Sequence, residues 1–363
     1  MKLAIISLGG FSSKAIAKEA EAYFEKVDLL DIRNLDISIT TKKMEVLYQG
    51  KPIEKYDCVY MRGSYKYALL QRSLSSILKG QTYLPIEPKA FTIAHNKLLT
   101  LLDLQKNKVP MPKTYFTATV EGAKTILKEI KYPVIIKIPQ GTHGKGVMFA
   151  DSESSARSVI DALEVFKQPY IIQEYIETKA TDIRAIVAGN RVLASMKRKA
   201  TKAEEFRANI HMGGIGVPFT PDPDTSDIAV KSAKAVGADI CAVDILEGRE
   251  PMVIEVNLSP GLRGIMKATK KNIAQLVAKF LAEKTEEYIE ENKRLTKFTA
   301  LTEEKIKEKK LKELLTSLNV KAGIIKLPKL VTEITGFHAD EEVILRMDKG
   351  KLVIEQHKIK KES

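Results

Sequence analysis

The sequence has no tryptophan, few aromatic residues (6%) and only two cysteines in 363 residues. Proteins that bind single-stranded nucleic acids stack bases on aromatic side chains, and no basic stripe with interleaved aromatics occurs here. Cys58 and Cys241 lie far apart in apolar, strand-like segments. This context favours buried free thiols over a disulfide or a metal-binding pair, and it predicts a reducing, cytoplasmic location.

Long apolar runs are also missing. No stretch approaches the ~20 residues that a membrane-spanning helix needs. The apolar N-terminal stretch of residues 2–8 is too short for a signal peptide and predicts a first strand. With 44% hydrophobic and 29% charged residues the composition is that of a globular protein without a membrane partner, and its length predicts two or more domains.

The formal net charge of +13 has two interpretations that composition leaves open. A basic protein can bind nucleic acid, or it can attract small anions and acidic protein tails. The scarcity of aromatic residues makes nucleic acid the less favoured partner.

Alternating and helical patterns predict a small open α/β domain at the N-terminus, followed by further strands and helices. Residues 3–8, 12–26 and 27–32 form a strand–helix–strand order, in which Gly9-Gly10 is a tight turn rather than a phosphate loop. Further strands are expected at residues 56–61, 114–117, 134–138 and 170–176, and hairpins at 182–195 and 242–257. Helices are expected at residues 96–104, 121–130, 228–235 and 273–292. Residues 301–313 are dense in Lys and Glu and predict a solvated helical linker.

The first group of functional residues follows the strand at 134–138. Lys137 points out of an otherwise apolar strand, and a lysine there is unusual unless it meets an anion. The glycine-rich segment that follows can close backbone N–H groups on phosphates, and it contains Gly141, Thr142, Gly144 and Gly146. The alternative is an edge-strand lysine before an ordinary loop.

The second group is Asp244, Glu255 and Asn257. Glu255 and Asn257 are two residues apart on a strand and so share one face. If the hairpin is symmetric about Arg249-Glu250, Asp244 lies opposite Glu255. Two close carboxylates repel each other unless a cation lies between them, and hard oxygen ligands suit Mg²⁺ or Mn²⁺. The alternative is a pair of solvated carboxylates.

Two weaker groups complete the set. The Glu174-Tyr175 strand end offers a backbone edge for a purine, and Asp182 offers a carboxylate for a ribose hydroxyl. A cationic cluster suits a triphosphate and consists of Arg198, Lys199, Arg207 and the neighbouring Asn209. Taken alone, the first is equally a strand running into a polar loop, and the second is equally a solvated face.

The order of these segments, from Lys97 to the Asn257-Leu258-Ser259-Pro260-Gly261-Leu262 motif, resembles the RimK-like ATP-grasp ligases. The resemblance covers about residues 1–285. It implies an ATP-grasp fold of class α/β and α+β in three subdomains, with ATP held between two α+β lobes. These are an N-terminal pre-ATP-grasp α/β domain at residues 1–87, a central lobe at 88–177 and a C-terminal lobe with the metal site at 178–295.

The resemblance also implies a role for each residue. Phosphates are contacted by Lys97, Lys137 and the glycine loop. Glu174 and Tyr175 present the hinge to adenine, and Asp182 takes the ribose side. Triphosphate and metal are held by Arg207 and Asn209, and Mg²⁺ (or Mn²⁺) is held by Asp244, Glu255 and Asn257.

The implied reaction is ATP-dependent amide-bond formation through an acyl phosphate. Arg184 and Arg207 are the candidates that stabilise the acyl phosphate and the tetrahedral intermediate, because this chemistry needs alignment and charge neutralisation. The expected product is glutamate, or a related amino acid, joined to a protein or cofactor acceptor, with release of ADP and phosphate.

Two departures from the family pattern affect this expectation. Arg207-Ala208-Asn209 replaces the Arg-Ser-Asn that the family often has. After Gly261-Leu262, residues 263–267 are basic where glutamate-adding members commonly carry acidic residues. The basic segment favours an acidic acceptor, such as a glutamate-rich tail or an anionic small molecule.

The C-terminal segment, residues 319–358, resembles the AbrB/SpoVT/MazE-type swapped-hairpin domain, after a charged helical linker at 296–318. The resemblance rests on Leu327-Pro328-Lys329, a short helix to Gly336, and a hairpin turn at residues 348–351. So short a unit rarely supports its own core, and interleaving two chains implies a homo-oligomer. Because many such domains bind DNA, the alternative function is a DNA-binding regulator that uses the ATP-grasp body as a nucleotide or metabolite sensor.

Overall fold

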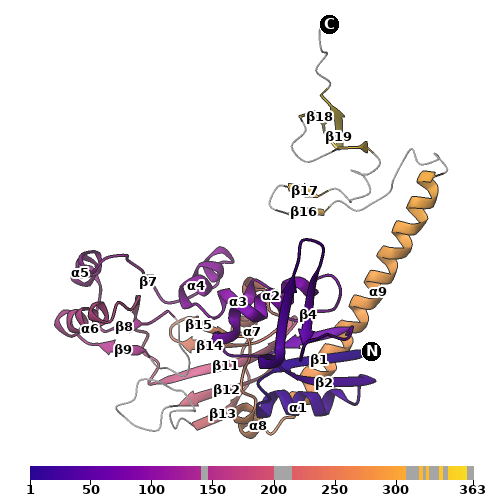
Figure 1. Cartoon of the computed structure of the whole chain (residues 1–363). Helices are drawn as coiled ribbons and strands as arrows, with labels where there is room; N and C mark the ends of the chain where they lie inside the picture. The colour runs from indigo at the N-terminus through magenta and orange to yellow at the C-terminus, as the bar shows by residue number, and fades with distance from the viewer. Residues whose placement is uncertain are drawn as a thin grey trace. The chain divides into compact units, whose positions relative to one another are not determined.

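The computed structural model describes residues 1–139, 146–199, 215–307, 319–321, 324–326, 335–337 and 342–357. The chain divides into two compact units, Met1–Glu287 and Tyr288–Ser363, and each is described by itself. Figure 1 labels their elements along the chain. Within the described ranges, no helix is both long and apolar enough to cross a membrane.

The first unit begins with a small parallel sheet. Its strands β2 (Lys26–Asp31), β1 (Lys2–Ser7) and β6 (Cys58–Met61) lie in that order, and α1 (Phe11–Ala20) packs on β1 and β2. Gly9 joins β1 to α1 with a φ of +72°, a backbone conformation that L side chains rarely adopt. The predicted strand–helix–strand order and the tight turn are therefore confirmed.

A second small sheet lies between β2 and β6 in the chain, and the sequence pattern did not predict it. It consists of the antiparallel strands β3 (Leu35–Ile39), β4 (Met44–Tyr48) and β5 (Lys51–Pro52), after the 3₁₀ turn η1 (Ile32–Asn34). Only Leu35 and Val46 are buried in these strands, so their hydrophobic alternation is weak. After β6 follow η2 (Tyr65–Tyr67) and α2 (Ala68–Leu78).

The next part of the chain forms a four-stranded sheet covered by helices. After α3 (Ala90–Ile93) and α4 (Lys97–Lys106), the strands lie in the order β7 (Thr114–Tyr115), β10 (Ile171–Glu174), β8 (Val134–Lys137) and β9 (Val147–Ala150). The helices α5 (Val120–Glu129) and α6 (Glu153–Val165) share a core with one face of the sheet. The opposite face of β8 is left for the site.

A five-stranded antiparallel sheet follows. Its order is β13 (Ile215–Phe219), β12 (Arg191–Lys199), β11 (Thr181–Ala188), β14 (Ile240–Glu247) and β15 (Pro251–Asn257), as Figure 1 shows. Both predicted hairpins are present. α7 (Pro223–Val236) packs on β11, β12, β14 and β15, and α8 (Arg263–Thr269) packs on β12 and β13.

Two helices are longer than their hydrophobic pattern predicted. α7 begins at Pro223 rather than near Ile228, because Asp222 caps it by accepting a hydrogen bond from the Thr225 N–H at 2.8 Å. α9 spans Ile273–Lys307 and includes residues assigned to the charged linker. The predicted limits at residues 87/88 and 177/178 fall between elements, and that at 295/296 falls inside α9. The domain limits remain predictions.

The described part of the second unit contains the end of α9 and two antiparallel strand pairs. β16 (Asn319–Lys321) pairs with β17 (Ile324–Lys326), and β18 (Val343–Asp348) pairs with β19 (Lys351–Gln356). The second pair turns at residues 349–350, as predicted. Large apolar side chains are exposed on this hairpin in the single chain: Val343, Ile344, Leu345, Met347 and Leu352. Residues 327–329 of the proposed AbrB-like pattern lie outside the described residues.

Candidate functional site

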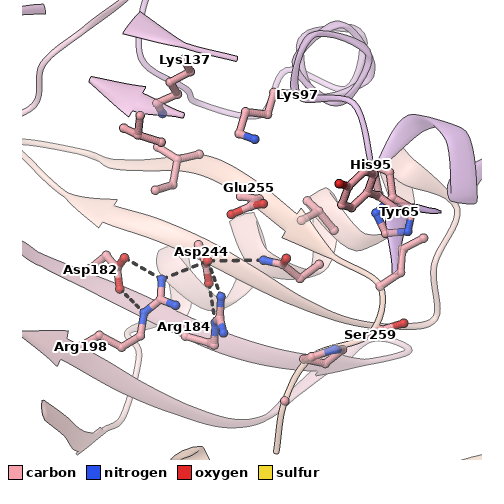
Figure 2. Close-up of a pocket in the computed structure, with 18 of the residues that line it drawn as sticks. Tyr65, His95, Lys97, Lys137, Asp182, Arg184, Arg198, Asp244, Glu255 and Ser259 are labelled. Atoms are coloured by element: carbon pink, nitrogen blue, oxygen red, sulfur yellow. Dashed lines mark hydrogen bonds and ion pairs between the residues drawn. The ribbon is translucent and has the colours of Figure 1, made fainter. Parts of the chain in front are cut away.

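A cavity of about 520 Å³ lies among the N-terminal sheet, the four-stranded sheet and the five-stranded sheet of the first unit. All three parts supply side chains to its wall, and Figure 2 shows many of them. The cavity brings together ten candidate residues that the sequence had singled out: Lys97, Lys137, Glu174, Tyr175, Asp182, Arg184, Arg198, Asp244, Glu255 and Asn257. The other candidates Gly141, Thr142, Gly144, Arg207 and Asn209 lie outside the described residues, and Gly146 is absent from the cavity wall.

Lys137 reaches the cavity because of the strand period. Val134 and Ile136 of β8 face the helices and join the core, whereas Ile135 and Lys137 line the cavity. The Lys137 Nζ donates a hydrogen bond to Gln173 Oε1 at 2.6 Å. Burial lowers the pKa of Lys137 to about 8, although the negative charge of Glu255 opposes the shift.

Lys97 also lines the cavity, and it lies in the first turn of α4. Asn96 caps this helix, with its Oδ1 accepting from the Leu98 N–H at 3.0 Å. The Lys97 backbone N–H donates to the Pro139 carbonyl at 3.0 Å, which ties α4 to the end of β8. Burial lowers the pKa of Lys97 and Glu255 raises it, so Glu255 acts on both lysines. Figure 2 shows Glu255 between these lysines and the carboxylates of the five-stranded sheet.

The hairpin of β14 and β15 holds the predicted metal ligands. Asp244 pairs in register with Glu255 and Ala242 with Asn257, so the predicted pairing is confirmed. The assumed symmetry about Arg249-Glu250 was wrong, because the register shifts between Asp244 and Ile245. The Asn257 amide donates to Asp244 Oδ2 at 3.4 Å. In the part of the chain that the structure describes, no group of three or more His, Cys, Asp or Glu gathers as a metal site. Two carboxylates and an amide oxygen suit Mg²⁺ only if a phosphate shares it.

Asp244 also belongs to a buried ionic network that the sequence did not predict. Arg184 donates to both of its oxygens, at 2.8 and 2.6 Å, and Arg198 Nη2 lies 3.0 Å from Oδ2. Arg198 in turn donates to both oxygens of Asp182 at 2.6 Å. Burial opposes ionisation of Asp244, but Arg184 and Arg198 hold its pKa at about 2.

Arg198 thus differs from the solvated cation that the sequence allowed. It is register-paired with Asp182 across the β11–β12 hairpin, where a register shift between Ile186 and Val187 sets the pairing. A regular hairpin that turns at residues 189–190 would instead place Lys197 opposite Asp182. Asp182, expected on the ribose side, is buried and bonded to Arg198. The ribose role stays a prediction.

The Glu174-Tyr175 segment forms the end of β10. The Glu174 N–H donates to the Lys113 carbonyl at 2.9 Å, so this strand edge is held in place. The Tyr175 ring meets Phe149 edge to face, with centroids 5.4 Å apart. The neighbouring cavity wall is apolar and suits a flat ring, with Ile135, Val147, Ile176 and Leu246.

The N-terminal domain lines the end of the cavity that contains Ser259. The sequence did not predict that this domain contributes to the site. The Gly63 N–H donates to Ser259 Oγ at 2.9 Å, and the Leu262 N–H donates to Ser12 Oγ at 2.8 Å. A Cβ on Gly63 would lie 2.7 Å from the Gln71 amide nitrogen, so a larger residue here would displace the Gln71 side chain. The only sequence signal was the polar Arg62-Gly63-Ser64 at the end of a buried strand.

Both halves of this architecture match known family models. Residues 94–281 match the RimK-like ATP-grasp domain, and residues 1–69 match the RimK PreATP-grasp domain. A curated relative, the probable alpha-L-glutamate ligase of Marinomonas sp. (strain MWYL1), is 35% identical over 291 residues, which are 78% of this chain and 96% of the relative.

Solved structures share the fold at lower identity. A RimK domain ATP-grasp protein from Sphaerobacter thermophilus DSM 20745 has a TM-score of 0.59 and 18% identity, over 77% of this chain and 99% of that one. The ATP-grasp ligase PsnB, solved with minimal precursor, Mg and ADP, has a TM-score of 0.60 and 18% identity, over 78% of this chain and 98% of that one. The predicted ATP-grasp fold is confirmed.

Proposed function

The chain belongs to the RimK-like ATP-grasp family, and we propose that it adds glutamate or a related amino acid to an acidic protein or small-molecule acceptor. It is an ATP-dependent ligase that forms an amide bond. The observation that supports the specific proposal is one cavity in which Lys97 and Lys137 face Glu255 and the Asp244 network, with the N-terminal domain closing the far end.

Lys97, Lys137 and the Glu174-Tyr175 hinge form the part of the cavity that binds the nucleotide. Lys97 and Lys137 are cations in a buried setting, and they neutralise the triphosphate. The strand edge at Glu174-Tyr175 and the apolar wall beside it receive the adenine ring. Asp244, Glu255 and Asn257 would hold Mg²⁺ (or Mn²⁺), which supplies further positive charge opposite the phosphates. Arg207 and Asn209 keep their proposed triphosphate roles on sequence grounds alone.

The reaction has two steps. A carboxylate oxygen of the acceptor attacks the γ-phosphorus of ATP, the bond to the bridging oxygen breaks, and ADP leaves. The neutral amine of the amino acid then attacks the acyl carbon. The phosphate leaves with the former carboxylate oxygen, and the surplus amine proton passes to solvent. Arg184, in the centre of the five-stranded sheet, supplies a guanidinium for the negative charge that develops on the acyl phosphate.

The basic surface near the cavity favours an acidic acceptor. Arg263 begins α8 directly after the cavity-lining segment of residues 258–261, and its guanidinium lies 4.6 Å from the centroid of the Phe11 ring. Lys267 lies on the same helix, and the whole chain has a net charge of +13. Positive potential raises the local concentration of acidic chains and their rate of association.

The test is a ligation assay with ATP, Mg²⁺, labelled glutamate and a set of synthetic peptides with glutamate-rich C-termini. We expect ADP and phosphate in equal amounts, and a peptide mass raised by whole glutamyl residues. Peptides with neutral or basic tails are the matched controls. Release of AMP and pyrophosphate would exclude the acyl-phosphate route, and modification of basic tails alone would exclude the acidic acceptor.

The second unit is proposed to join two chains. Its exposed apolar hairpin residues, such as Leu345 and Met347, would be covered by a second copy in an AbrB-like swapped arrangement.

The free, buried thiols of Cys58 and Cys241 support a cytoplasmic location, because neither forms a disulfide.

A further inference from the structure

Arg62 is a buried arginine at the end of β6 that lines the cavity and has no assigned role. Its residue exposure is only 5%. The guanidinium donates to Ser13 Oγ at 3.2 Å, to the Tyr60 hydroxyl at 2.8 Å and to the Pro260 carbonyl at 2.7 Å. These acceptors come from three separate segments, so the side chain is held in one position.

All three acceptors of Arg62 are neutral. Among the residues that the structure describes, no carboxylate forms an ion pair with it, whereas Arg184 and Arg198 share Asp244. A buried charge costs several kcal/mol unless it is paired, and a guanidinium has more N–H groups than these acceptors use. Because Arg62 lines the cavity, this points to an anion in the cavity as the missing partner.

The surroundings of Arg62 consist of further donors. Ser7 Oγ accepts from the Gly9 N–H, Ser12 Oγ from the Leu262 N–H, and Ser259 Oγ from the Gly63 N–H. Each of these cavity-lining hydroxyls therefore keeps its own proton for a ligand. The N-terminus of α1 lies at the same end, and its first turn contains no acidic residue.

We propose that Arg62, with Ser12 and Ser259, binds the α-carboxylate of the free amino acid that supplies the amine. This inference rests on the proposed function. Ser259 lies away from Lys137 and Asp182 in Figure 2, and Arg62 binds the carbonyl of the neighbouring Pro260, so Arg62 lies at a different end of the cavity from Lys137. The carboxylate that becomes phosphorylated must lie at the phosphate end. A carboxylate held by Arg62 is kept away from ATP and remains a free acid in the product.

The test compares glutamate with glutamic acid α-amide, which keeps the amine and loses the α-carboxylate. We expect the wild type to prefer glutamate in kcat/KM by about 30-fold or more, because the amide leaves a buried arginine unpaired. Arg62→Met should reduce this preference to about threefold or less by raising the KM for glutamate, with the KM for ATP unchanged. Arg62→Lys should give an intermediate preference.

Arg72→Met is the matched control, because Arg72 is exposed on α2 and outside the cavity wall, and it should keep the wild-type preference. Equal use of glutamate and its α-amide by the wild type overturns the proposal, even if Arg62→Met does not fold. A preference that survives in Arg62→Met overturns it as well. A preference that instead depends on the last carboxylate of the acceptor peptide would assign Arg62 to the acceptor.

A binding measurement separates this inference from the proposed ligase specificity. Calorimetry on the wild type with ADP and Mg²⁺ present gives the affinities of glutamate and its α-amide without turnover. Absence of ligation combined with selective, Arg62-dependent glutamate binding would reject the proposed acceptor and keep the carboxylate subsite. Ligation without selective, Arg62-dependent glutamate binding would reject the carboxylate subsite and keep the proposed acceptor.

Discussion

Arg184 and Asp244 form a two-point ion pair across β11 and β14, with Nε to Oδ1 at 2.8 Å and Nη2 to Oδ2 at 2.6 Å. Asp244 also pairs with Arg198, whose side chain is 4% exposed against 15% for Arg184. One carboxylate proposed for metal binding is therefore shared by two guanidinium groups. Because Arg184 is the more accessible of the two, it is the one expected to turn from Asp244 to the substrate when the site fills.

Glu255→Gln should abolish turnover and leave the fold intact. Glu255 lies opposite Asp244 but has no ion pair within the described part of the chain, so its charge is available for Mg²⁺. The amide keeps the shape and loses that charge. We expect the free energy of unfolding to change by about 1 kcal/mol or less, as measured by urea denaturation. Near-normal activity at saturating Mg²⁺ would show that the hairpin is not the metal site.

Asp244→Asn is the contrasting substitution on the same hairpin. It removes the charge that Arg184 and Arg198 share, so Arg184 loses its ion pair and Asp182 alone remains to pair with the buried Arg198. The free energy of unfolding should fall by about 3–5 kcal/mol, in addition to the loss of turnover. Equal stability of the Asp244→Asn and Glu255→Gln proteins in the same urea titration would contradict the structural role of the network.

Arg184→Met should lower kcat by about 100-fold or more, because it removes a donor for the developing negative charge. The nucleotide contacts are made elsewhere, so the affinity for ADP measured by calorimetry should stay within about threefold of the wild type. Arg191→Met, an exposed arginine at the start of β12, is the control. A large loss of ADP affinity without a loss of kcat would assign Arg184 to nucleotide binding.

The affinity for ATP should decrease as the pH rises above about 8. The pKa of Lys137 is lowered to about 8 by burial, and only its protonated form attracts the triphosphate. Below this pH the lysine is charged in the free protein and affinity is flat; above it, the dissociation constant should rise by up to about tenfold per pH unit. Lys137→Arg keeps its charge throughout and should flatten the profile. If the dissociation constant for ATP rises equally with pH in the wild type and in Lys137→Arg, a group other than Lys137 titrates.

Truncation after residue 295 should leave an active ligase of lower oligomeric state. The buried residues of α9 that belong to the first unit, from Ile273 to Thr285, are retained by this cut. The apolar hairpin of β18 and β19 is removed. Light scattering should report a smaller mass with ADP release preserved. An unchanged oligomeric state would place the interface in the ATP-grasp body. In that case, binding of the full chain to a DNA duplex at low salt would favour the DNA-binding alternative.

The sequence by itself determined the elements with strong periods and the residues that they present. Period-two spacing placed Lys137 on the cavity face of β8. The assumed hairpin symmetry gave the correct pairing of Asp244 with Glu255, although in the structure a register shift between Asp244 and Ile245 produces it. Both follow from local geometry within one or two neighbouring strands. The weakly patterned strands β3 to β5 were not predictable in this way, because few of their residues alternate between core and solvent. The start of α7 was missed because the Asp222 cap and Pro223 set it, ahead of the apolar pattern.

Only the tertiary structure decided which charges meet. Arg184 and Asp244 are 60 residues apart in the chain, and Arg62 lies 198 residues from Pro260, whose carbonyl it binds. Sequence spacing says nothing about contacts at such separations, because they depend on how the sheets pack. From the sequence alone, an arginine such as Arg198 can be a solvated cation or a buried partner of Asp182. Its neighbours decide between the two, and those neighbours depend on how whole strands pair.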